Sequence, residues 1–374
     1  MEIRSDRPAE KEDRPRGGPI LIAARNLDHP EARLFAELAR KGWRMEAVLH
    51  PERRHAAWLE EAGIPIHELD LGPRRLPGAV RAELAEILQR GKFRIVHSLH
   101  NSALRGVWKT IPRGMDAPRW IAYRGAMNLT WSSLWFYRRI PVDAVVCVCE
   151  AVRAHLLGRG LPDRMLRGIY KGHDPAWYPA SSRALLREFN IPPGAVVFGS
   201  AASWRPSKGG ALWLEALQRV PPDVPIVALA IGDLRDRQME RLARDPRWRD
   251  RIRLAGPRPD AAALMGACDG MVMPTLEREG LCKAVIEAAI QGVPAIVSDA
   301  GGMPEIIRDG MEGLVVPRGQ AAALASAMEH MARDADFRAA CGRRARERIL
   351  SAFHLRQTVA AYDNLYTELL SPRS

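Results

Sequence analysis

The sequence lacks any apolar run long enough to cross a membrane. Its longest uninterrupted runs, "PIVALAI" (225–231) and "AVVCVC" (144–149), fall well short of the roughly 20 residues that span a bilayer. The first 18 residues also lack the apolar core and cleavage site of a secretory signal, and their polar, proline- and glycine-containing composition predicts a disordered leader. We therefore expect the protein to remain in the cytoplasm.

Cysteine is scarce and shows no pairing pattern. The five cysteines form no CxxC pair, so the sequence supports neither a disulfide framework nor a zinc ribbon, and we expect free thiols. The G-x-G-x-x-G motif is also missing after the first predicted strand, which disfavours a dinucleotide-dependent oxidoreductase.

Negative charge is in deficit. Lysine and arginine number 56 against 44 aspartates and glutamates, which gives a net charge of +12. Such a balance favours an anionic partner, and nucleic acid, an acidic membrane surface and a phosphorylated substrate all qualify. The arginines are scattered and no RNP, zinc-finger or basic-zipper pattern occurs, so nucleic acid is the weakest of the three.

What the sequence does contain is a regular alternation of strand and helix patterns over 374 residues, enough for two domains. Short β-rich runs alternate with segments whose apolar residues recur every three or four positions, which indicates parallel sheets covered by helices. We expect an α/β protein of two domains that join near residues 172–182. The predicted strands are 19–24, 44–50, 94–100, 119–125 and 143–150, then 195–202, 225–232, 251–256, 269–275 and 294–299.

The loop "SWRPSKGG" (203–210) follows a predicted strand of the second domain. Ligands of open α/β sheets bind at the carboxyl ends of strands, where loops lead into helices. Arg205 and Lys208 next to glycines and a helix that starts near Gly210 suit a diphosphate. A solvated basic turn is the alternative.

A second loop and the helix after it, "TLEREGLCKAVIE" (275–287), contain two carboxylates that are eight positions apart in the sequence. Glu279 precedes Gly280 and Glu287 lies about one turn inside the helix, so both can approach one elongated ligand. Carboxylates accept bidentate hydrogen bonds from vicinal hydroxyls, which ribose and hexose both present. The alternative is that Glu279 is only a charge at the helix start and Glu287 only a surface residue. The apolar neighbours of Glu287 weaken this alternative, because a carboxylate among them needs a partner.

This segment resembles the E-x7-E signature of retaining glycosyltransferases of family 4. The resemblance continues through "GVPAIVSDAGGMPEIIRDGMEGLVVP" (292–317), "YKGHD" (170–174) and "VCEAVR" (148–153). It implies a GT-B fold, with two Rossmann-like domains facing across a cleft. The expected division is residues 19–175 plus a returning final helix, 356–374, for the acceptor domain, and 176–355 for the nucleotide-sugar domain.

By this resemblance, Glu287 binds the nucleotide ribose and Glu279 the donor sugar, while Arg205 and Lys208 stabilise the departing diphosphate. The backbone amides of Gly280, Leu281 and Cys282 assist, Ser203 stands where the family has a phosphate-binding arginine, and Pro257 and Arg258 lie where the base is recognised. The chain departs from the family in two further ways: residues 23–34 lack the usual double glycine, and Cys282 replaces a glycine.

First-domain candidates for the acceptor side are His97, His100 and Arg124. The family often places a histidine in a loop there, and Arg124 stands where a histidine is common, so it could contact a phosphate instead. A histidine near a strand end is more often structural.

Two further stretches each have two interpretations. The aromatic and basic segment 128–141 fits either a peripheral contact with anionic membrane lipids or ordinary core packing. Asp334 and Asp336 form a D-x-D string, a metal ligand elsewhere, but they lie between two helical patterns and are predicted to cap a helix. We therefore expect metal-independent catalysis, with no cofactor beyond a nucleotide-diphospho-sugar co-substrate.

The resulting prediction is a retaining glycosyltransferase with a saccharide or lipid-linked saccharide acceptor, in the assembly of lipopolysaccharide or another cell-surface glycan. A GT-B nucleotide-sugar epimerase or phosphorylase is one alternative. A basic binding module with an inert cleft is another, and its affinity would survive loss of Glu279 and Glu287.

Overall fold

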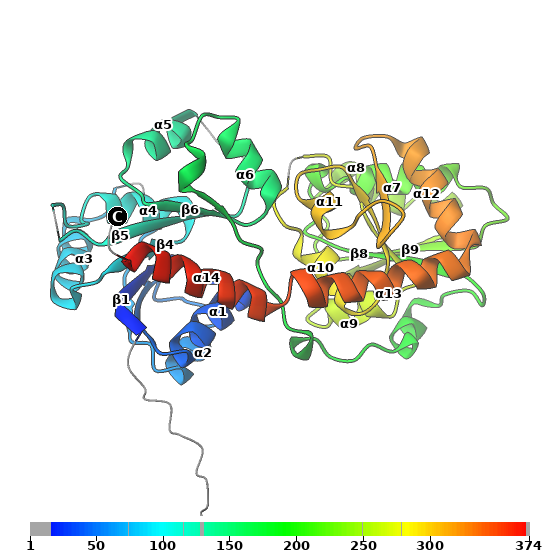
Figure 1. Cartoon of the computed structure of the whole chain (residues 1–374). Helices are drawn as coiled ribbons and strands as arrows, with labels where there is room; N and C mark the ends of the chain where they lie inside the picture. Colours follow the sequence, from blue (N-terminus) through cyan, green and yellow to red (C-terminus); the bar gives the residue numbers. More distant parts are fainter. Residues whose placement is uncertain are drawn as a thin grey trace, which may run out of the picture. The chain divides into compact units, whose positions relative to one another are not determined.

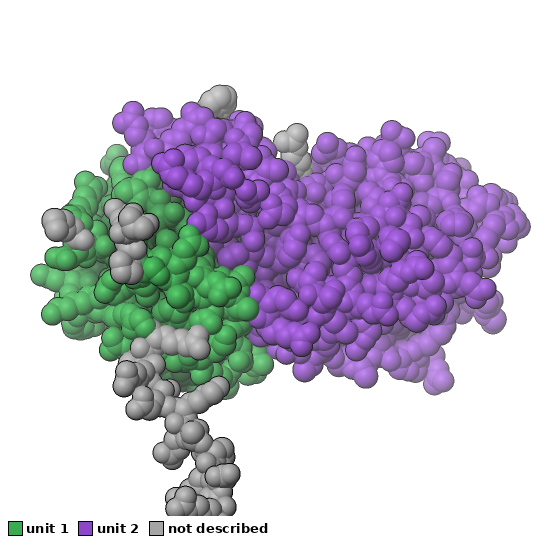
Figure 2. Space-filling model, viewed as in Figure 1, with its two compact units in different colours: residues 1–123, 140–144, 359–374 green, residues 124–139, 145–358 purple. Residues whose placement is uncertain are grey.

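The computed structural model describes residues 16–73, 75–114, 116–127, 131–248, 250–277 and 279–371, and of Arg16 and residues 131–133 only the backbone. Residues 1–15 of the predicted leader lie outside this part. Arg16 to Gly18, which the sequence analysis also assigned to the leader, belong instead to strand β1 (Arg16–Ala23). The contacts within the chain define two compact units, residues 1–123, 140–144 and 359–374, and residues 124–139 and 145–358 (Figure 2).

The first sheet has seven strands in the order β3-β2-β1-β4-β5-β6-β7, and every pairing described between them is parallel. Besides β1 they are β2 (Trp43–Leu49), β3 (Ile66–Glu68), β4 (Ile95–Ser98), β5 (Arg119–Arg124), β6 (Ala144–Cys147) and β7 (Leu166–Gly168). All five strands predicted here are present. The strands β3 and β7 were missed because three residues are too few to show a periodic pattern.

Seven α-helices accompany these strands in the described part of the chain. They are α1 (His29–Arg40), α2 (Ala57–Glu61), α3 (Gly78–Gly91), α4 (His100–Trp108), α5 (Trp131–Arg139), α6 (Glu150–Leu157) and, at the end of the chain, α14 (Leu355–Leu370). Helix α1 begins with a capping box, in which Asp28 accepts the amide of Glu31 and Glu31 accepts that of Asp28, both at 3.0 Å.

The second sheet has six parallel strands in the order β10-β9-β8-β11-β12-β13. They are β8 (Val196–Ala201), β9 (Ile226–Ile231), β10 (Ile252–Gly256), β11 (Gly270–Met273), β12 (Ala295–Ser298) and β13 (Gly313–Val316). The first five were predicted. Strand β13 was not, because its single short run follows a glycine-rich turn that reads as loop.

Helices cover both faces of the second sheet (Figure 1), and each face has its own apolar core. Along each strand successive side chains alternate between the two cores: Met271 and Met273 of β11 face one, and Val272 faces the other. The first core includes helices α9 (Ala261–Gly266), α10 (Lys283–Ile290) and α13 (Ala335–Ala352), and the second α7 (Gly210–Arg219), α8 (Arg237–Ala243) and α12 (Ala321–Arg333). A short helix, α11 (Met303–Ile306), follows β12.

Burial on both faces explains why these strands read as near-continuous apolar runs. The five cysteines are all buried and free, as expected. Among the helices described, none is both long and apolar enough to cross a membrane.

Candidate functional site

The loop after β8 carries the first predicted cations. Trp204 anchors it, because the indole N–H donates to the carbonyl of Ile231 at 3.0 Å within the core. Arg205 precedes a single 3₁₀ turn (Pro206–Lys208), and α7 follows at Gly210. Gly209 has a φ of 70°, and a Cβ there would lie 2.0 Å from the carbonyl oxygen of Pro274. Only glycine allows this loop to approach the end of β11 so closely.

The loop after β11 supplies the carboxylate. The amide of Leu276 donates to the carbonyl of Ser207 at 2.9 Å, which joins the two loops. The ammonium of Lys208 donates to Glu279 Oε1 at 2.6 Å, and the Thr275 hydroxyl donates to Glu279 Oε2 at 3.3 Å. The structure therefore places the predicted cation and the predicted carboxylate in direct contact.

Helix α10 begins beside this ion pair. Its N-cap residue, Cys282, is buried and makes no side-chain cap bond. Burial raises the pKa of the Cys282 thiol to about 12; the nearby Glu279 charge also raises it, and the Lys208 charge lowers it. Both charges thus act on the amino terminus of α10, where the helix dipole favours an anion.

Glu287 lies five residues beyond Cys282, about 7.5 Å along the helix axis. Its side chain is 15% exposed, and Lys283 approaches its Oε1 at 3.1 Å. Burial raises the pKa of the Glu287 carboxyl group, and the Lys283 charge opposes this only in part. A largely desolvated carboxylate gains from hydrogen-bond donors, and the two hydroxyls of a ribose would supply them.

The other residues predicted to bind the nucleotide sugar differ in their exposure and contacts. Arg205 is exposed, and within the described part of the chain its guanidinium has no ion-pair partner. Ser203 contributes its carbonyl to the amide of Arg205 at 2.8 Å. Pro257 is exposed, whereas Arg258 already contacts Asp260 and Glu188, each at 2.8 Å. The Arg258 side chain is therefore engaged in its own domain.

Of the candidates near the first sheet, His97 is a core residue. Its ring is fully buried, with Nδ1 2.9 Å from the Tyr366 hydroxyl and the ring stacked on Tyr362 at 5.5 Å. Burial lowers its pKa to about 3. No surface of the ring is open to a ligand. His97 is therefore better explained as a structural residue than as an acceptor-side candidate.

His100 and Arg124 differ from His97 and from each other. His100 is exposed and opens α4 with a φ of 68°, a left-handed conformation that is uncommon outside glycine and recurs at functional sites. Arg124 ends β5, is buried, and donates from Nε to the carbonyl of Ala126 at 2.7 Å. Its guanidinium thus helps to hold the loop after β5.

The aromatic segment around α5 has both exposed and buried side chains, so part of it fits the predicted membrane contact and part fits core packing. Trp135 is 54% exposed, with the guanidinium of Arg139 5.0 Å from its ring, whereas Leu134 and Tyr137 are buried. Residues 128–130, the side chains of 131–133 and, in the loop after β11, Arg278 lie outside the described part.

Asp334 caps a helix, as predicted. It is the N-cap residue of α13 and accepts the amide of Phe337 at 2.8 Å. In the ranges that the structure describes, no three His, Cys, Asp or Glu side chains are grouped so as to hold a metal ion.

Sequence reasoning missed two contributors to the site, Thr275 and Lys283. Thr275 is 2% exposed at the end of β11, and a polar residue closing an apolar strand was an available signal. Lys283 stands four residues before Glu287, the spacing of a helical ion pair.

Comparison with known proteins shows which proteins the chain is similar to. Residues 193–334 match the family described as glycosyl transferases group 1. The chain is 27% identical over 337 residues to the lipopolysaccharide core biosynthesis glycosyltransferase LpsE of Rhizobium meliloti, covering 88% of this chain and 92% of that one. It is 23% identical to N-acetyl-alpha-D-glucosaminyl L-malate synthase of Bacillus anthracis, over 56% of this chain and about half, 55%, of that one.

Solved structures agree on the fold. A glycosyltransferase from Rickettsia africae has a TM-score of 0.80 at 19% identity, covering 96% of this chain and 100% of that one. Anabaena HepE in complex with UDP has a TM-score of 0.77 at 17% identity, covering 94% and 100%. The chain therefore has the GT-B fold, as predicted, and residues 193–334 match a group 1 glycosyltransferase domain, in agreement with the predicted kind of enzyme.

Proposed function

We propose that this protein transfers a glycosyl group from a nucleotide-diphospho sugar to a saccharide acceptor with retention of anomeric configuration. The observation that carries the proposal is the contact of Lys208 with Glu279 at the amino terminus of α10, with the buried Glu287 on the same helix. A sugar nucleotide presents sugar hydroxyls, then a diphosphate, then ribose hydroxyls. Glu279 suits the first, Lys208 and the helix amides suit the second, and Glu287 suits the third.

Glu287 holds the ribose end of the donor. Its desolvated carboxylate accepts hydrogen bonds from the two ribose hydroxyls, and the charge of the neighbouring Lys283 offsets part of the cost of burying the ionised group. Glu279 uses Oε1 to orient Lys208 and retains acceptor capacity on Oε2 for a hydroxyl of the transferred sugar.

Lys208 and Arg205 stabilise the leaving diphosphate. Negative charge grows on the β-phosphate as the glycosidic bond breaks, and preorganised cations aimed at that charge lower the barrier. The amides of Gly280, Leu281 and Cys282 at the start of α10 add the helix dipole. Two cations and a helix terminus supply what a divalent metal supplies elsewhere, so the reaction proceeds without a metal.

The acceptor belongs to lipopolysaccharide or another cell-surface glycan. Similarity to LpsE along most of both chains supports this class, and a net charge of +12 suits an anionic or lipid-linked saccharide. The enzyme works in the cytoplasm, and the exposed Trp135 with Arg139 contributes to a peripheral contact with acidic lipid at the inner membrane face.

The test is direct. Purified protein is screened by thermal shift against nucleoside diphosphates, and then incubated with the matching nucleotide sugars and short acceptor saccharides, with and without EDTA. We expect stabilisation by one nucleoside diphosphate, EDTA-resistant transfer, and a product whose anomeric proton coupling matches that of the donor. Absence of stabilisation by every nucleoside diphosphate would overturn the proposal, and an inverted product would overturn retention.

A further inference from the structure

Glu305 ties together three segments that are far apart in the chain. Its carboxylate accepts the amide of Glu150 at 2.9 Å and that of Ala151 at 2.6 Å, the first two residues of α6. The N-cap residue of α6, Cys149, makes no side-chain cap bond. Glu305 thus caps this helix from 155 residues away, with the sign of charge that a helix amino terminus favours.

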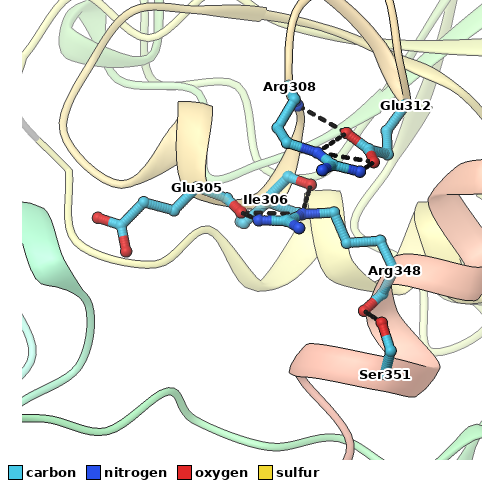
Figure 3. A network of polar contacts seen from close by, with 6 residues as sticks. All are labelled: Glu305, Ile306, Arg308, Glu312, Arg348 and Ser351. Carbon is cyan, nitrogen blue, oxygen red and sulfur yellow. Dashed lines mark hydrogen bonds and ion pairs between the residues drawn. The ribbon is translucent and has the colours of Figure 1, made fainter.

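The backbone of Glu305 is fixed as firmly as its side chain. Arg348 of α13 donates from Nη2 to the Glu305 carbonyl at 2.6 Å, and from Nε to the carbonyls of Glu305 and Ile306 at 3.1 Å each. Figure 3 shows the Arg348 guanidinium against these carbonyls, with the Glu305 carboxylate extending away from them. Burial raises the pKa of the Tyr170 phenol, and the nearby Glu305 carboxylate raises it further.

The residues just before Glu305 directly contact the loop after β11, which carries Glu279. The amide of Gly302 donates to the carbonyls of Glu279 at 3.1 Å and Gly280 at 3.2 Å. A Cβ at Gly301 would lie 1.7 Å from the Glu279 carbonyl oxygen, and one at Gly302 would lie 2.8 Å from the sulfur of Cys149. The backbone of Gly301 and Gly302 therefore packs directly on that of Glu279 and Gly280, with the Cys149 sulfur against Gly302, so a shift of the 301–305 segment moves Glu279.

We propose that Glu305 is a positioning residue for the transfer reaction: by capping α6 it holds Gly302 against the Glu279–Gly280 backbone and so keeps Glu279 and Lys208 in their reactive arrangement. Glu305 has no contact with the donor in this scheme. The expected effect on kcat rests on the proposed function. The contacts that connect α6 through Glu305 and Gly302 to Glu279 do not depend on any ligand.

The kinetic test uses Glu305→Ala and Glu305→Gln. Loss of both cap bonds in Glu305→Ala releases the loop, and we expect kcat to fall about 10- to 100-fold, the range typical of supporting contacts. Nucleoside diphosphate affinity should fall by a smaller factor than kcat, because the contact of Glu287 with the ribose is untouched. Glu305→Gln keeps one oxygen acceptor without the charge, so it should recover part of the lost kcat.

Glu312→Gln is the matched control. Glu312 is a fully buried carboxylate close by in the chain, and its partner is Arg308, whose amide it accepts at 2.8 Å and whose side chain it pairs with (Figure 3), in contrast to the α6 amides that Glu305 accepts. It should lower the unfolding temperature without the selective loss of kcat. An equal kcat loss in Glu312→Gln at an equal drop in unfolding temperature would mean that Glu305 acts only on stability, which would overturn the proposal.

Hydrogen–deuterium exchange supplies a measurement that needs no activity. In the unliganded protein, Glu305→Ala should speed exchange of the Gly302 amide and of the segment 279–286, whereas Glu312→Gln should leave that segment at the wild-type rate. Unchanged exchange of 279–286 in Glu305→Ala would refute the link whatever the kinetics show. If the wild type binds no nucleotide, the proposed function fails and exchange alone decides this inference.

Discussion

The ammonium of Lys208 lies 2.6 Å from the carboxylate of Glu279, 71 residues further along the chain. Both side chains are about one quarter exposed, so the pair is partly screened and its value for stability is small, about 1 kcal/mol or less. Its importance lies in orientation. Held by Glu279, the Lys208 charge has a fixed direction before the substrate arrives, which is the condition for electrostatic catalysis.

The first prediction concerns this pair. Lys208→Ala should lower kcat about 100- to 1,000-fold, because one preorganised charge on the leaving group is lost, and Lys208→Arg should recover part of that rate. The measurement is steady-state kinetics at saturating donor.

Combining this change with Glu279→Gln separates the roles of the carboxylate. If Glu279 acts partly through Lys208, the double variant loses less than the product of the two single losses. Strict multiplication of the losses would contradict the orienting role and leave Glu279 as a sugar ligand alone.

The second prediction concerns Glu287. Because burial raises the pKa of this carboxyl group, it takes up a proton at a higher pH than an ordinary glutamate. Nucleoside diphosphate affinity should therefore fall as pH is lowered from neutrality toward 4.5, and calorimetric titration across that range measures it. Glu287→Gln should weaken binding about tenfold or more at pH 7 and remove this pH dependence.

The same shift has a stability consequence of opposite sign. A folded-state pKa above the unfolded value means that the native state binds the extra proton, so this group favours folding at low pH and disfavours it as pH rises through the folded pKa. At pH 7, unliganded Glu287→Gln should therefore unfold at a temperature equal to or above that of the wild type, the pattern of a site that trades stability for function. A marked drop would show that the Lys283 contact outweighs desolvation.

The third prediction concerns Asp334. Asp334→Ala removes the N-cap of α13 and should destabilise the protein by about 1 kcal/mol, while kcat and its resistance to EDTA stay unchanged. Asp336→Ala, which keeps the cap, serves as the control for charge. A kcat that collapsed in both variants and returned with added Mg²⁺ or Mn²⁺ would instead assign the D-x-D string to metal binding.

The fourth prediction concerns His97. His97→Phe leaves the buried Tyr366 hydroxyl without its partner and should cost about 1–3 kcal/mol of stability, with kcat of the folded enzyme within about twofold of wild type. His100→Ala should do the reverse, lowering kcat at nearly constant stability. A large kcat loss in His97→Phe alone would restore His97 as a reaction residue.

The pH dependence of stability checks the same residue. The pKa of His97 is about 3 in the folded protein against a usual 6.5, so the unfolded chain binds more protons between those values and stability falls as pH falls through that window. Thermal unfolding followed from pH 6.5 to pH 4 should therefore show a shallower loss for His97→Phe than for the wild type.

The sequence by itself determined the two parallel sheets and the carboxylate spacing. Ten of the strands were predictable because burial on both faces demands continuous apolar runs, which any reading of the chain detects. Glu279, Gly280 and Glu287 could be found because their arrangement is local: a strand end, a turn and one turn of helix fix it within about ten residues.

Only the tertiary structure decided which partner each polar group has. The sequence offered His97 and His100 as equals, but one faces Tyr366, 269 residues away, and the other opens a helix in a left-handed conformation. In the same way, Arg258 is engaged by Glu188, and Glu305 caps a helix 155 residues earlier. Such pairings depend on how remote backbone segments pack, and no local pattern of residues encodes them.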